Sequence, residues 1–528
     1  MLTILTNIKE QTELFLESLL LNPPENKKEL EKRKRRARYL PNSMLLLERY
    51  KDGIEEGKYE VNPDILQLFQ KQRTRSISGI TAITILLKPW PCQGECVYCP
   101  TEARMPKSYL SGEPAVMRAI LNRWDAKRQV YTRIRALEMM GHNTEKNELI
   151  ILGGTWQNYP KPYREEYIRR MYEGLNGKRS ATIEEAQIVN ETSEHRCIGL
   201  SLETRPDCVN EKEVIHMRWL GATKIELGVQ TVFEDVSDAT KRGHDMEAVY
   251  NATKILKDAG YKIHYHIMPN LPGSTIEKDE EMFKVLFEDP RLKPDMLKVY
   301  PCVVVEHSEL KMWEDENRHY SYTDEEVIEL LIRSKQYIPN YCRVMRLGRD
   351  IPAYDIVSGN TITNIREVVH QRMRERGMTC KCIRCREVGF REIPDDQIVL
   401  RQTEYEASDG KEYFIEYIHP ETETLFGFVR LRIPSQVFSG EKHFMPELQD
   451  CALIRELHTY GQVVPIGKKK TEATQHKGFG KQLLEIAENI AKKEYGLSKI
   501  AVISGIGTRE YYRKYGYELE DLYMTKSL

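Results

Sequence analysis

The stretch Lys88-Pro-Trp-Pro-Cys92-Gln-Gly-Glu-Cys96-Val-Tyr-Cys99-Pro100 sets the architecture of this chain. Its three cysteines have the spacing C-x3-C-x2-C, and they follow the apolar run of residues 80–87, which predicts a strand. Soft thiolates select iron–sulfur clusters or zinc. A closed zinc site would need a fourth ligand, and the next histidine is the distant His142. We therefore expect the thiolates to hold three irons of a 4Fe–4S cube and to leave the fourth iron open to a small molecule.

An aromatic residue, Tyr98, directly before the last cysteine and a strand before the first complete a pattern that resembles the radical S-adenosylmethionine (SAM) enzymes. The resemblance implies a 4Fe–4S cluster on Cys92, Cys96 and Cys99, with SAM as the chelating small molecule. A zinc clip or a chance spacing is the alternative.

The composition limits the class of protein. The chain has 528 residues, a net charge of −1 and a pI near 6.9, so two to four domains and no global basic field are expected. No apolar run approaches the ~20 residues of a membrane span, and the first residues lack the pattern of a signal peptide. Six of the eleven cysteines form two tight clusters, which favours a reducing, cytoplasmic setting.

Residues 1–75 are predicted to be a basic helical region, because residues 27–38 hold eight basic and two acidic side chains. The alternatives there are a contact with phosphate and a solvated helix face. Residues 76–355 alternate short β-branched runs with segments of helical period, which predicts a partial (βα) barrel of about six units. In such folds the chemistry lies on loops after the strands.

Three of these loops carry glycine, charged or amide residues directly at the end of a predicted strand. Gly153, Gly154 and Thr155 follow one predicted strand, and the two glycines allow a close backbone approach to a ligand. Glu203 and Arg205 end the next strand, and Gln230 ends the one after it. By the radical SAM resemblance these residues bind SAM; Thr155 replaces the acid of the usual Gly-Gly-Glu loop, so only the backbone role transfers. A plain tight turn is the alternative for the glycines. His264 and His266 are expected to be ordinary core or hydrogen-bonding residues without a role in the chemistry.

Residues 356–395 are predicted to be a basic linker that carries a second cysteine cluster. Cys380, Cys382 and Cys385 lie within six residues, and His370 could complete a Cys3His structural zinc site. An unligated, reduced cluster is the alternative. The arginines around it and those of residues 343–349 predict a positive surface.

Residues 396–528 change to alternating strands, then a Gly-x-Gly turn at 478–480 that leads into an amphipathic helix. A glycine-rich turn at a helix N-terminus is an anion site. The turn and the ending Tyr511-Tyr512-Arg-Lys-Tyr-Gly-Tyr517 resemble the GCN5-related N-acetyltransferases, which grip coenzyme A there. The whole fold class is thus α/β: a partial barrel of radical SAM type followed by an α+β acetyltransferase domain.

Both modules on one chain resemble the catalytic subunit of Elongator in its stand-alone archaeal form. Matching residues run from Arg73 to the C-terminus and include Leu202-Glu-Thr-Arg-Pro-Asp207 and Cys385-Arg-Glu-Val-Gly389. One departure is Thr101-Glu102, where eukaryotic members carry glycines. The first 70 residues match least.

The resemblance implies an acyltransferase that acts on the wobble uridine, uridine 34, of the tRNA anticodon stem-loop. In the mechanism proposed for the family, a SAM-derived radical takes hydrogen from the methyl group of acetyl-CoA, the acetyl radical adds to carbon 5 of the base, and thioester hydrolysis leaves a carboxymethyl group. The tRNA would lie on the basic N-terminal run and the surface formed by residues 343–391. The resemblance assigns coenzyme A contacts to Lys146, Glu456, Leu457, His458, Thr459, Phe479, Gly480, Lys481 and Tyr512. For Lys146 the alternative is an exposed lysine at a helix end.

Two rival hypotheses come from other classes of protein. One is a protein lysine acetyltransferase in which the iron–sulfur cluster only supports structure. The other is a tRNA-binding scaffold with decayed chemistry. The sequence leaves open which tRNAs are chosen, whether partner subunits are needed, what reduces the cluster, whether the chain forms a homodimer, and how far apart the two sites lie.

Overall fold

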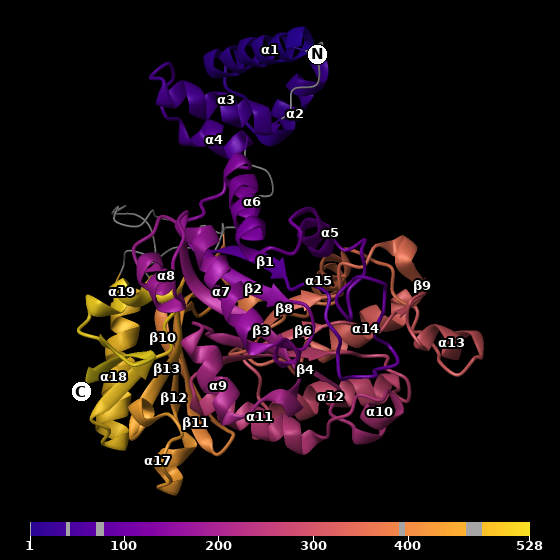
Figure 1. Cartoon of the computed structure of the whole chain (residues 1–528), viewed down its shortest axis with the longest axis vertical. Coiled ribbons are helices and arrows are strands. Elements are labelled where there is room, and N and C mark those ends of the chain that lie inside the picture. Colours follow the sequence, from indigo (N-terminus) through magenta and orange to yellow (C-terminus); the bar gives the residue numbers. More distant parts are fainter. Residues whose placement is uncertain (1, 38–42, 70–78, 390–396, 461–477) are drawn as a thin grey trace.

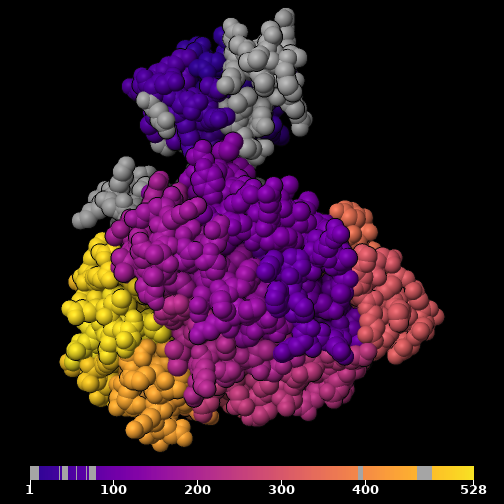
Figure 2. Space-filling model, in the orientation of Figure 1, coloured from indigo at the N-terminus to yellow at the C-terminus, as the bar shows by residue number. Residues whose placement is uncertain are grey.

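The computed structural model describes residues 2–37, 43–69, 79–389, 397–460 and 478–528. A small helical lobe projects from a larger body that holds two seven-stranded sheets (Figure 1, Figure 2). None of the described helices combines the length and the hydropathy that a membrane crossing requires. Residues 461–477, directly before the Gly-x-Gly turn, and the basic residues Lys71, Arg73 and Arg75 of the predicted N-terminal region lie outside the described residues.

The N-terminal lobe consists of α1 (Leu2–Leu21), α2 (Lys27–Arg36), α3 (Ser43–Glu55) and α4 (Pro63–Phe69). Its own small core includes Leu16, Leu47, Tyr50 and Phe69. The basic run forms α2, as predicted; Asn26 caps its N-terminus by accepting a hydrogen bond from the Glu29 N–H. The lobe meets the body along α6, where the Lys51 ammonium donates to the Glu138 carbonyl. The exposed part of α2 therefore faces solvent on a projecting lobe.

The central sheet is wholly parallel, with strand order β1-β2-β3-β4-β5-β6-β8. This confirms the partial barrel, with seven strands rather than about six. The strands are β1 (Thr81–Leu86), β2 (Lys146–Leu152), β3 (Arg196–Thr204), β4 (Lys224–Gln230), β5 (Lys262–Ile267), β6 (Met296–Val299) and β8 (Arg343–Leu347). Isoleucine, leucine and valine side chains on one face of each strand pack against the surrounding helices.

Helices cover the outer face of this half barrel (Figure 1). They are α5 (Pro114–Leu121), α6 (Ala126–Met139), α7 (Lys161–Asn176), α8 (Ile183–Asn190), α9 (Glu211–Trp219), α10 (Glu234–Ala239), α11 (Met246–Asp258), α12 (Ile276–Glu288) and α14 (Asp324–Ser334). The short α13 (Leu310–Asp315) lies away from this face, and its Leu310 packs with Cys96 and Val97. A two-stranded ribbon joins β7 (Val304–Val305) to β9 (Ile356–Ser358) beside the helices. After it, α15 (Ile365–Glu375) and α16 (Ile383–Arg386) form the linker that carries the second cysteine cluster.

The C-terminal sheet has strand order β10-β11-β12-β13-β14-β16-β15 and is antiparallel except for the β13–β14 pair. Its strands are β10 (Val399–Ala407), β11 (Gly410–His419), β12 (Thr424–Ile433), β13 (Cys451–Thr459), β14 (Lys499–Val502), β15 (Glu518–Glu520) and β16 (Tyr523–Ser527). One face packs against α18 (Phe479–Tyr495), which crosses from β13 to β14, and the short helices are α17 (Ser435–Ser439) and α19 (Arg509–Arg513). This confirms the predicted α+β domain.

The other face of the C-terminal sheet packs against the half barrel through buried charges. Arg432 binds Asp258 of α11, and Arg455 binds Asp295 just before β6; all four side chains are at most 1% exposed. Backbone also meets backbone closely, because a β-carbon at Gly505 would lie 2.1 Å from the Ile198 carbonyl oxygen. The two domains therefore form one interlocked body, and a residue of one domain can take part in a site of the other.

The arginines of the linker do not form the single positive surface that was predicted. Arg343 binds Glu387 and the Tyr460 hydroxyl, and Arg386 is buried against Glu416. Arg349 binds Glu113. Because folding pairs these guanidinium groups inside the protein, the prediction is wrong for them. Among the described linker residues, the exposed cations are Arg374, Arg376, Lys381 and Arg384, and Arg376 pairs with Glu329.

Candidate functional site

The loop of Cys92, Cys96 and Cys99 lies at the carboxyl end of the half barrel. It is fixed by backbone hydrogen bonds from Val97 N–H to the Thr240 carbonyl and from Leu310 N–H to the Val97 carbonyl. Cys96 is buried, and the other two cysteines are half-buried. Burial raises the pKa of the Cys99 thiol to about 12, and the neighbouring Cys96 adds to this. A bound metal would deprotonate such a thiol.

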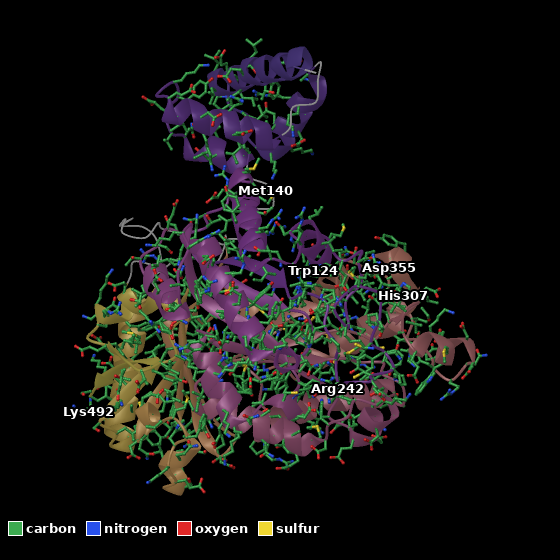
Figure 3. All side chains as sticks on the ribbon, in the orientation of Figure 1. Trp124, Met140, Arg242, His307, Asp355 and Lys492 are labelled. Carbon is green, nitrogen blue, oxygen red and sulfur yellow. The ribbon has the colours of Figure 1, made fainter. Side chains whose placement is uncertain are left out.

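Two arginines surround this loop and make it suitable for an anionic cluster. The Arg242 guanidinium lies 3.6 Å from Cys96 Sγ, in position to donate a hydrogen bond to it. Gly94 packs against Arg205, because a β-carbon there would lie 2.6 Å from Arg205 Nη1 and 3.7 Å from the sulfur atoms of Cys92 and Cys96. Arg205 Nη1 is buried without a hydrogen-bond partner among the described residues. The thiols, the cations and this unpartnered donor fit a 4Fe–4S cluster. Figure 3 labels Arg242 within the half barrel, far from Lys492 of α18.

The other residues predicted to bind SAM converge on the same end of the sheet. The Glu203 carboxylate accepts hydrogen bonds from the Tyr109 hydroxyl at 2.8 Å and the Gly154 N–H at 3.4 Å. Gly153 and Gly154 have φ values of 141° and 91°, which explains the need for glycine after β2. Gln230 follows a β-bulge in β4, and its Oε1 is buried without a partner in the described part of the chain. The fold thus brings Glu203, Gly154 and Gln230 to the mouth of the half barrel, while Thr155 is buried.

The inner face of the half barrel is polar, whereas bulky apolar residues fill a closed (βα)8 barrel. Glu226 on β4 lies 2.9 Å from His266 Nε2 and forms an ion pair with Lys298. His266 Nδ1 is in turn 3.7 Å from Glu203. This cluster extends the mouth into the barrel. Sequence reasoning missed it because it treated the histidines as separate core residues. The available signal was the alternation of titratable and apolar residues in Lys224–Glu226 of β4 and in Lys262–His266 of β5.

Glu226, His264 and His266 place their ligand atoms within 4.8 Å of one another. The Lys298 ammonium already neutralises the Glu226 carboxylate, so this cluster is not suited to a metal ion. Burial lowers the pKa of His264 to about 3, and this histidine therefore stays neutral near pH 7. Its two ring nitrogens have no hydrogen-bond partner in the described structure.

The predicted coenzyme A strand lies at the opposite, amino end of the half barrel. β13 pairs with β14 only as far as Ile454 and Val502, whereas it stays paired with β12 through Thr459. The two strands separate beyond that point, so one backbone edge of residues 457–459 has no sheet partner among the residues that the structure describes. Such an edge can pair with an extended ligand.

The helix α18 starts beside this open edge. Gly478 caps it in the left-handed conformation at φ 78°, and the N–H groups of the first turn, from Phe479 to Lys481, form an anion site. Gly480 allows the Tyr511 hydroxyl to approach, because a β-carbon there would lie 2.5 Å from it. Phe479 stacks on Tyr417, and Lys481 is exposed. The structure therefore brings residues 456–459 and 479–481 together.

Side chains of both domains meet at this end. Glu456 lies 3.4 Å from Lys262 of β5 and 3.4 Å from Arg430 of β12. Tyr512 is 7% exposed, and burial, followed by the charge of Glu456, raises its pKa. Burial lowers the pKa of His458 to about 4.

Lys146 is the first residue of β2, so the alternative of an exposed lysine at a helix end is wrong. Burial lowers its pKa. It lies at the amino end of the sheet, the same end that faces the C-terminal domain.

The two candidate sites thus occupy opposite ends of one parallel sheet. The residues of β4 run from Lys224 to Gln230, which spans roughly 20 Å at 3.3 Å per residue. The polar inner face lies between the ends. The two candidate sites are therefore separated along the strand direction of the sheet.

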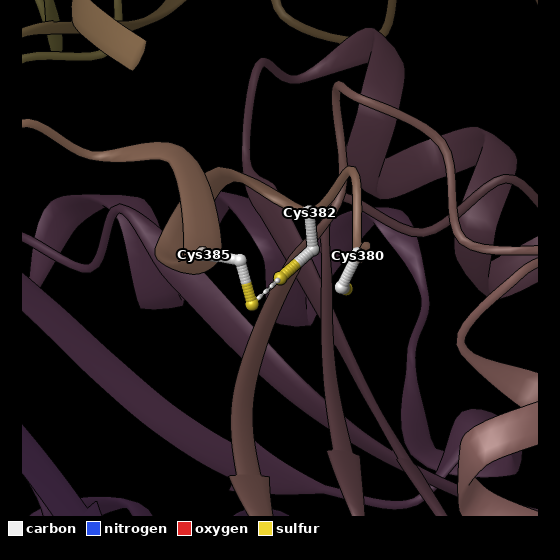
Figure 4. A group of neighbouring side chains, drawn as sticks. All are labelled: Cys380, Cys382 and Cys385. Carbon is white, nitrogen blue, oxygen red and sulfur yellow. Dashed lines mark hydrogen bonds between the residues drawn. The ribbon is translucent and has the colours of Figure 1, made fainter. Parts of the chain in front are cut away.

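The second cysteine cluster is compact (Figure 4). The sulfur atoms of Cys380, Cys382 and Cys385 lie within 4.8 Å of one another, and those of Cys382 and Cys385 are 3.4 Å apart. His370 Nε2 is 3.6 Å from Cys385 Sγ. Tetrahedral zinc with Zn–S bonds of about 2.3 Å needs sulfur atoms about 3.8 Å apart, so the three cysteines fit a zinc site. His370 contacts Cys385 but does not lie within 4.8 Å of all three sulfur atoms.

Comparison with known proteins agrees with this geometry. A model of the radical SAM superfamily matches residues 92–286, and one of the radical SAM C-terminal domain matches residues 294–375. The tRNA uridine(34) acetyltransferase of Methanocaldococcus jannaschii is 44% identical over 479 residues, which is 88% of this chain and 87% of the relative. Elongator complex protein 3 of Homo sapiens is 40% identical over 471 residues, 86% of this chain and 85% of that protein.

A solved structure shows the same fold. The archaeal Methanocaldococcus infernus Elp3 with an N-terminal deletion of residues 1–46 aligns with a TM-score of 0.76 and 39% identity, over 85% of this chain and 100% of the other. With this identity over most of its length, the chain belongs to the family that comprises the tRNA uridine(34) acetyltransferases and Elongator complex protein 3.

Proposed function

We propose that this protein is a radical SAM acyltransferase that uses acetyl-CoA to add a carboxymethyl group to carbon 5 of the wobble uridine of tRNA. The observation that carries the proposal is that one half barrel has the cysteine loop at its carboxyl end and the open backbone edge of residues 457–459 at its amino end. Such an edge suits the extended arm of coenzyme A. The printed name of the relatives, tRNA uridine(34) acetyltransferase, supports the proposal. The same proposal makes tRNA the substrate and places the protein in the cytoplasm.

At the carboxyl end, Cys92, Cys96 and Cys99 would ligate the 4Fe–4S cluster, and bound SAM would supply a carbon-centred radical. Arg242 and Arg205 place positive charge beside the thiolates. The Glu203 carboxylate and the backbone at Gly153 and Gly154 would hold the amino group of SAM, with Gln230 facing the same ligand.

At the amino end, the open backbone edge of Leu457, His458 and Thr459 would pair with the extended arm of acetyl-CoA. The first turn of α18, from Phe479 to Lys481, would bind its pyrophosphate. Tyr512 would face the thioester, and Lys146 would contact the acetyl-CoA from the half barrel.

The tRNA would bind the exposed cations of the N-terminal lobe, among them Lys28, Lys32 and Arg36, and those of the linker, Arg374, Lys381 and Arg384. The wobble base would have to leave the anticodon stack to reach the reacting atoms, as for other enzymes that act on a base. The N-terminal lobe projects from the body, so it can contact RNA at a distance from the catalytic ends (Figure 2).

The proposal is tested with reconstituted protein under anaerobic conditions, with SAM, dithionite, bulk tRNA and acetyl-CoA labelled in the acetyl group. Nucleoside mass spectrometry should find the label in 5-carboxymethyluridine, and omission of SAM or dithionite should abolish it. Label on protein lysines, with unmodified tRNA and intact SAM, would instead support the rival lysine acetyltransferase. The SAM-facing residues at the mouth disfavour that rival, which does not need them.

We also propose structural zinc on Cys380, Cys382, Cys385 and His370. Replacing Cys382 by serine should lower the zinc content from about one per chain to near zero and lower the melting temperature, because a closed site contributes directly to folding. Elemental analysis of zinc and iron measures this, with Cys451→Ala as the control, since that buried thiol lies outside the cluster. Full zinc content in the Cys382→Ser variant would contradict the assignment.

A further inference from the structure

Lys262 is the first residue of β5, yet its side chain contacts the other domain. Its ammonium lies 3.4 Å from the Glu456 carboxylate of β13, and the two side chains are 17% and 8% exposed. On the half-barrel side, Lys262 also lies within electrostatic range of Glu148 of β2, which binds Lys224 at 2.7 Å. The ammonium group therefore contacts the Glu456 carboxylate of the other domain and lies in the field of Glu148 of its own domain.

The contact differs from the ion pairs that join the domains elsewhere. Arg432 binds Asp258 with two hydrogen bonds of 2.9 and 2.6 Å, and neither side chain is more than 1% exposed. The contacts of Glu456 with Lys262 and Arg430 are both long, at 3.4 Å, and the carboxylate keeps some exposure. Glu456 also directly precedes the open backbone edge at residues 457–459 and lies near Tyr512. This is the geometry of a binding site rather than of a closed interface.

Several charged groups face Glu456 from the elements packed around it. Cations come from Lys262 on β5, Arg430 on β12 and Arg343 on β8, and the like charge of Asp295 precedes β6. His458 lies two residues further along β13 and Tyr512 on α19. Burial alone would raise the pKa of Glu456, but the charges of Lys262 and Arg430 hold it below its ordinary value. Of these, Lys262 is the cation that the radical SAM half supplies at contact distance.

We propose that Lys262 is a positioning residue of the acetyl-CoA site: it holds the Glu456 carboxylate in place and ionised beside the thioester. The inference rests on the proposed function and deepens it, because it makes cleavage of the thioester depend on a residue of the other domain.

The step that Glu456 would serve is hydrolysis of the thioester. The oxygen of a water molecule attacks the carbonyl carbon, and Glu456 accepts the proton that this water loses. The carbon–sulfur bond then breaks with its electron pair on sulfur, and the coenzyme A thiolate takes up a proton to leave as the thiol. No oxidant or reductant is consumed. Glu456 must be ionised to accept the proton, and the neighbouring Lys262 favours the ionised form.

The test compares Lys262→Met and Lys262→Arg in the full-length reconstituted protein. Release of free coenzyme A from acetyl-CoA is followed in the complete reaction between pH 5.5 and 9, together with formation of 5′-deoxyadenosine. The matched control is Lys254→Met, because Lys254 also pairs with a carboxylate of the C-terminal domain, Asp409 at 2.6 Å, but is 39% exposed and not near Glu456.

We expect Lys262→Met to lower coenzyme A release about 10-fold or more at pH 6.5. Loss of the cation should move the acidic limb of its pH profile upward by about one unit or more. Lys262→Arg should restore most of the activity and the profile. The Lys254→Met variant should behave as the wild type, and 5′-deoxyadenosine formation should be unchanged in all variants.

An unshifted profile in Lys262→Met, or an equal loss at every pH in both Lys262 variants, would overturn the inference. These outcomes are distinct from failure of the proposed function. If only the inference fails, the wild type still labels tRNA and releases coenzyme A. If the proposed function fails, the wild type itself leaves tRNA unlabelled.

Discussion

Replacing Cys96 by alanine should abolish labelling of tRNA by acetyl-CoA. Cys96 is the buried member of the triad, and Arg242 approaches its sulfur at 3.6 Å. With two thiolates left, the cluster loses one of its three protein ligands, and the open fourth iron cannot compensate for it. Iron and sulfide should fall to background after reconstitution, and no 5′-deoxyadenosine should form.

The control for this variant is Cys302→Ala, whose buried thiol packs in the same small core as Cys96 and Val97 but lies outside the motif. It should keep its iron and most of its activity. Binding of acetyl-CoA, followed by calorimetry, should survive in both variants, because that site lies at the opposite end of the sheet. Retention of a full cluster by the Cys96→Ala variant would exclude the assigned ligand set.

Replacing Asp295 by asparagine should lower the free energy of unfolding by about 3 kcal/mol or more. Asp295 is fully buried, binds Arg455 Nη1 at 3.1 Å and lies 3.5 Å from Arg430. Burial alone would raise the pKa of Asp295, but Arg455 and Lys257 hold it well below its ordinary value. Asparagine keeps the shape of the side chain and removes its charge, so two buried guanidinium groups lose the anion they share.

The matched control is Asp409→Asn, which removes the 69%-exposed partner of Lys254 in an ion pair between the same two domains. Solvent screens this pair, so its loss should cost less than about 1 kcal/mol. Urea unfolding monitored in both domains gives the two midpoints, with the slopes compared to detect a change in cooperativity. Equal midpoints for the two variants would show that the buried charges at Asp295 do not hold the domains together.

The sequence alone predicted those features whose residues lie close together along the chain. The C-x3-C-x2-C loop, the glycines at 153 and 154 and the cysteine cluster at 380–385 each place their groups within a few residues, so no knowledge of the fold is needed to see them. The alternation of apolar strands and amphipathic helices predicted a parallel half barrel, because a strand buried on one face by helices must be apolar there. Family resemblance added the coenzyme A residues.

Contacts between distant residues were decided only by the tertiary structure. The sequence predicted Arg343 and Arg386 as part of a positive surface, but folding pairs them with Glu387 and Glu416. It likewise could not show that Lys262 meets Glu456, 194 residues further along the chain. A charged side chain has the same sequence signature whether it faces solvent, a buried partner or a ligand. Only the packing of one domain on the other distinguishes these cases, and here it places the two candidate sites at opposite ends of one sheet.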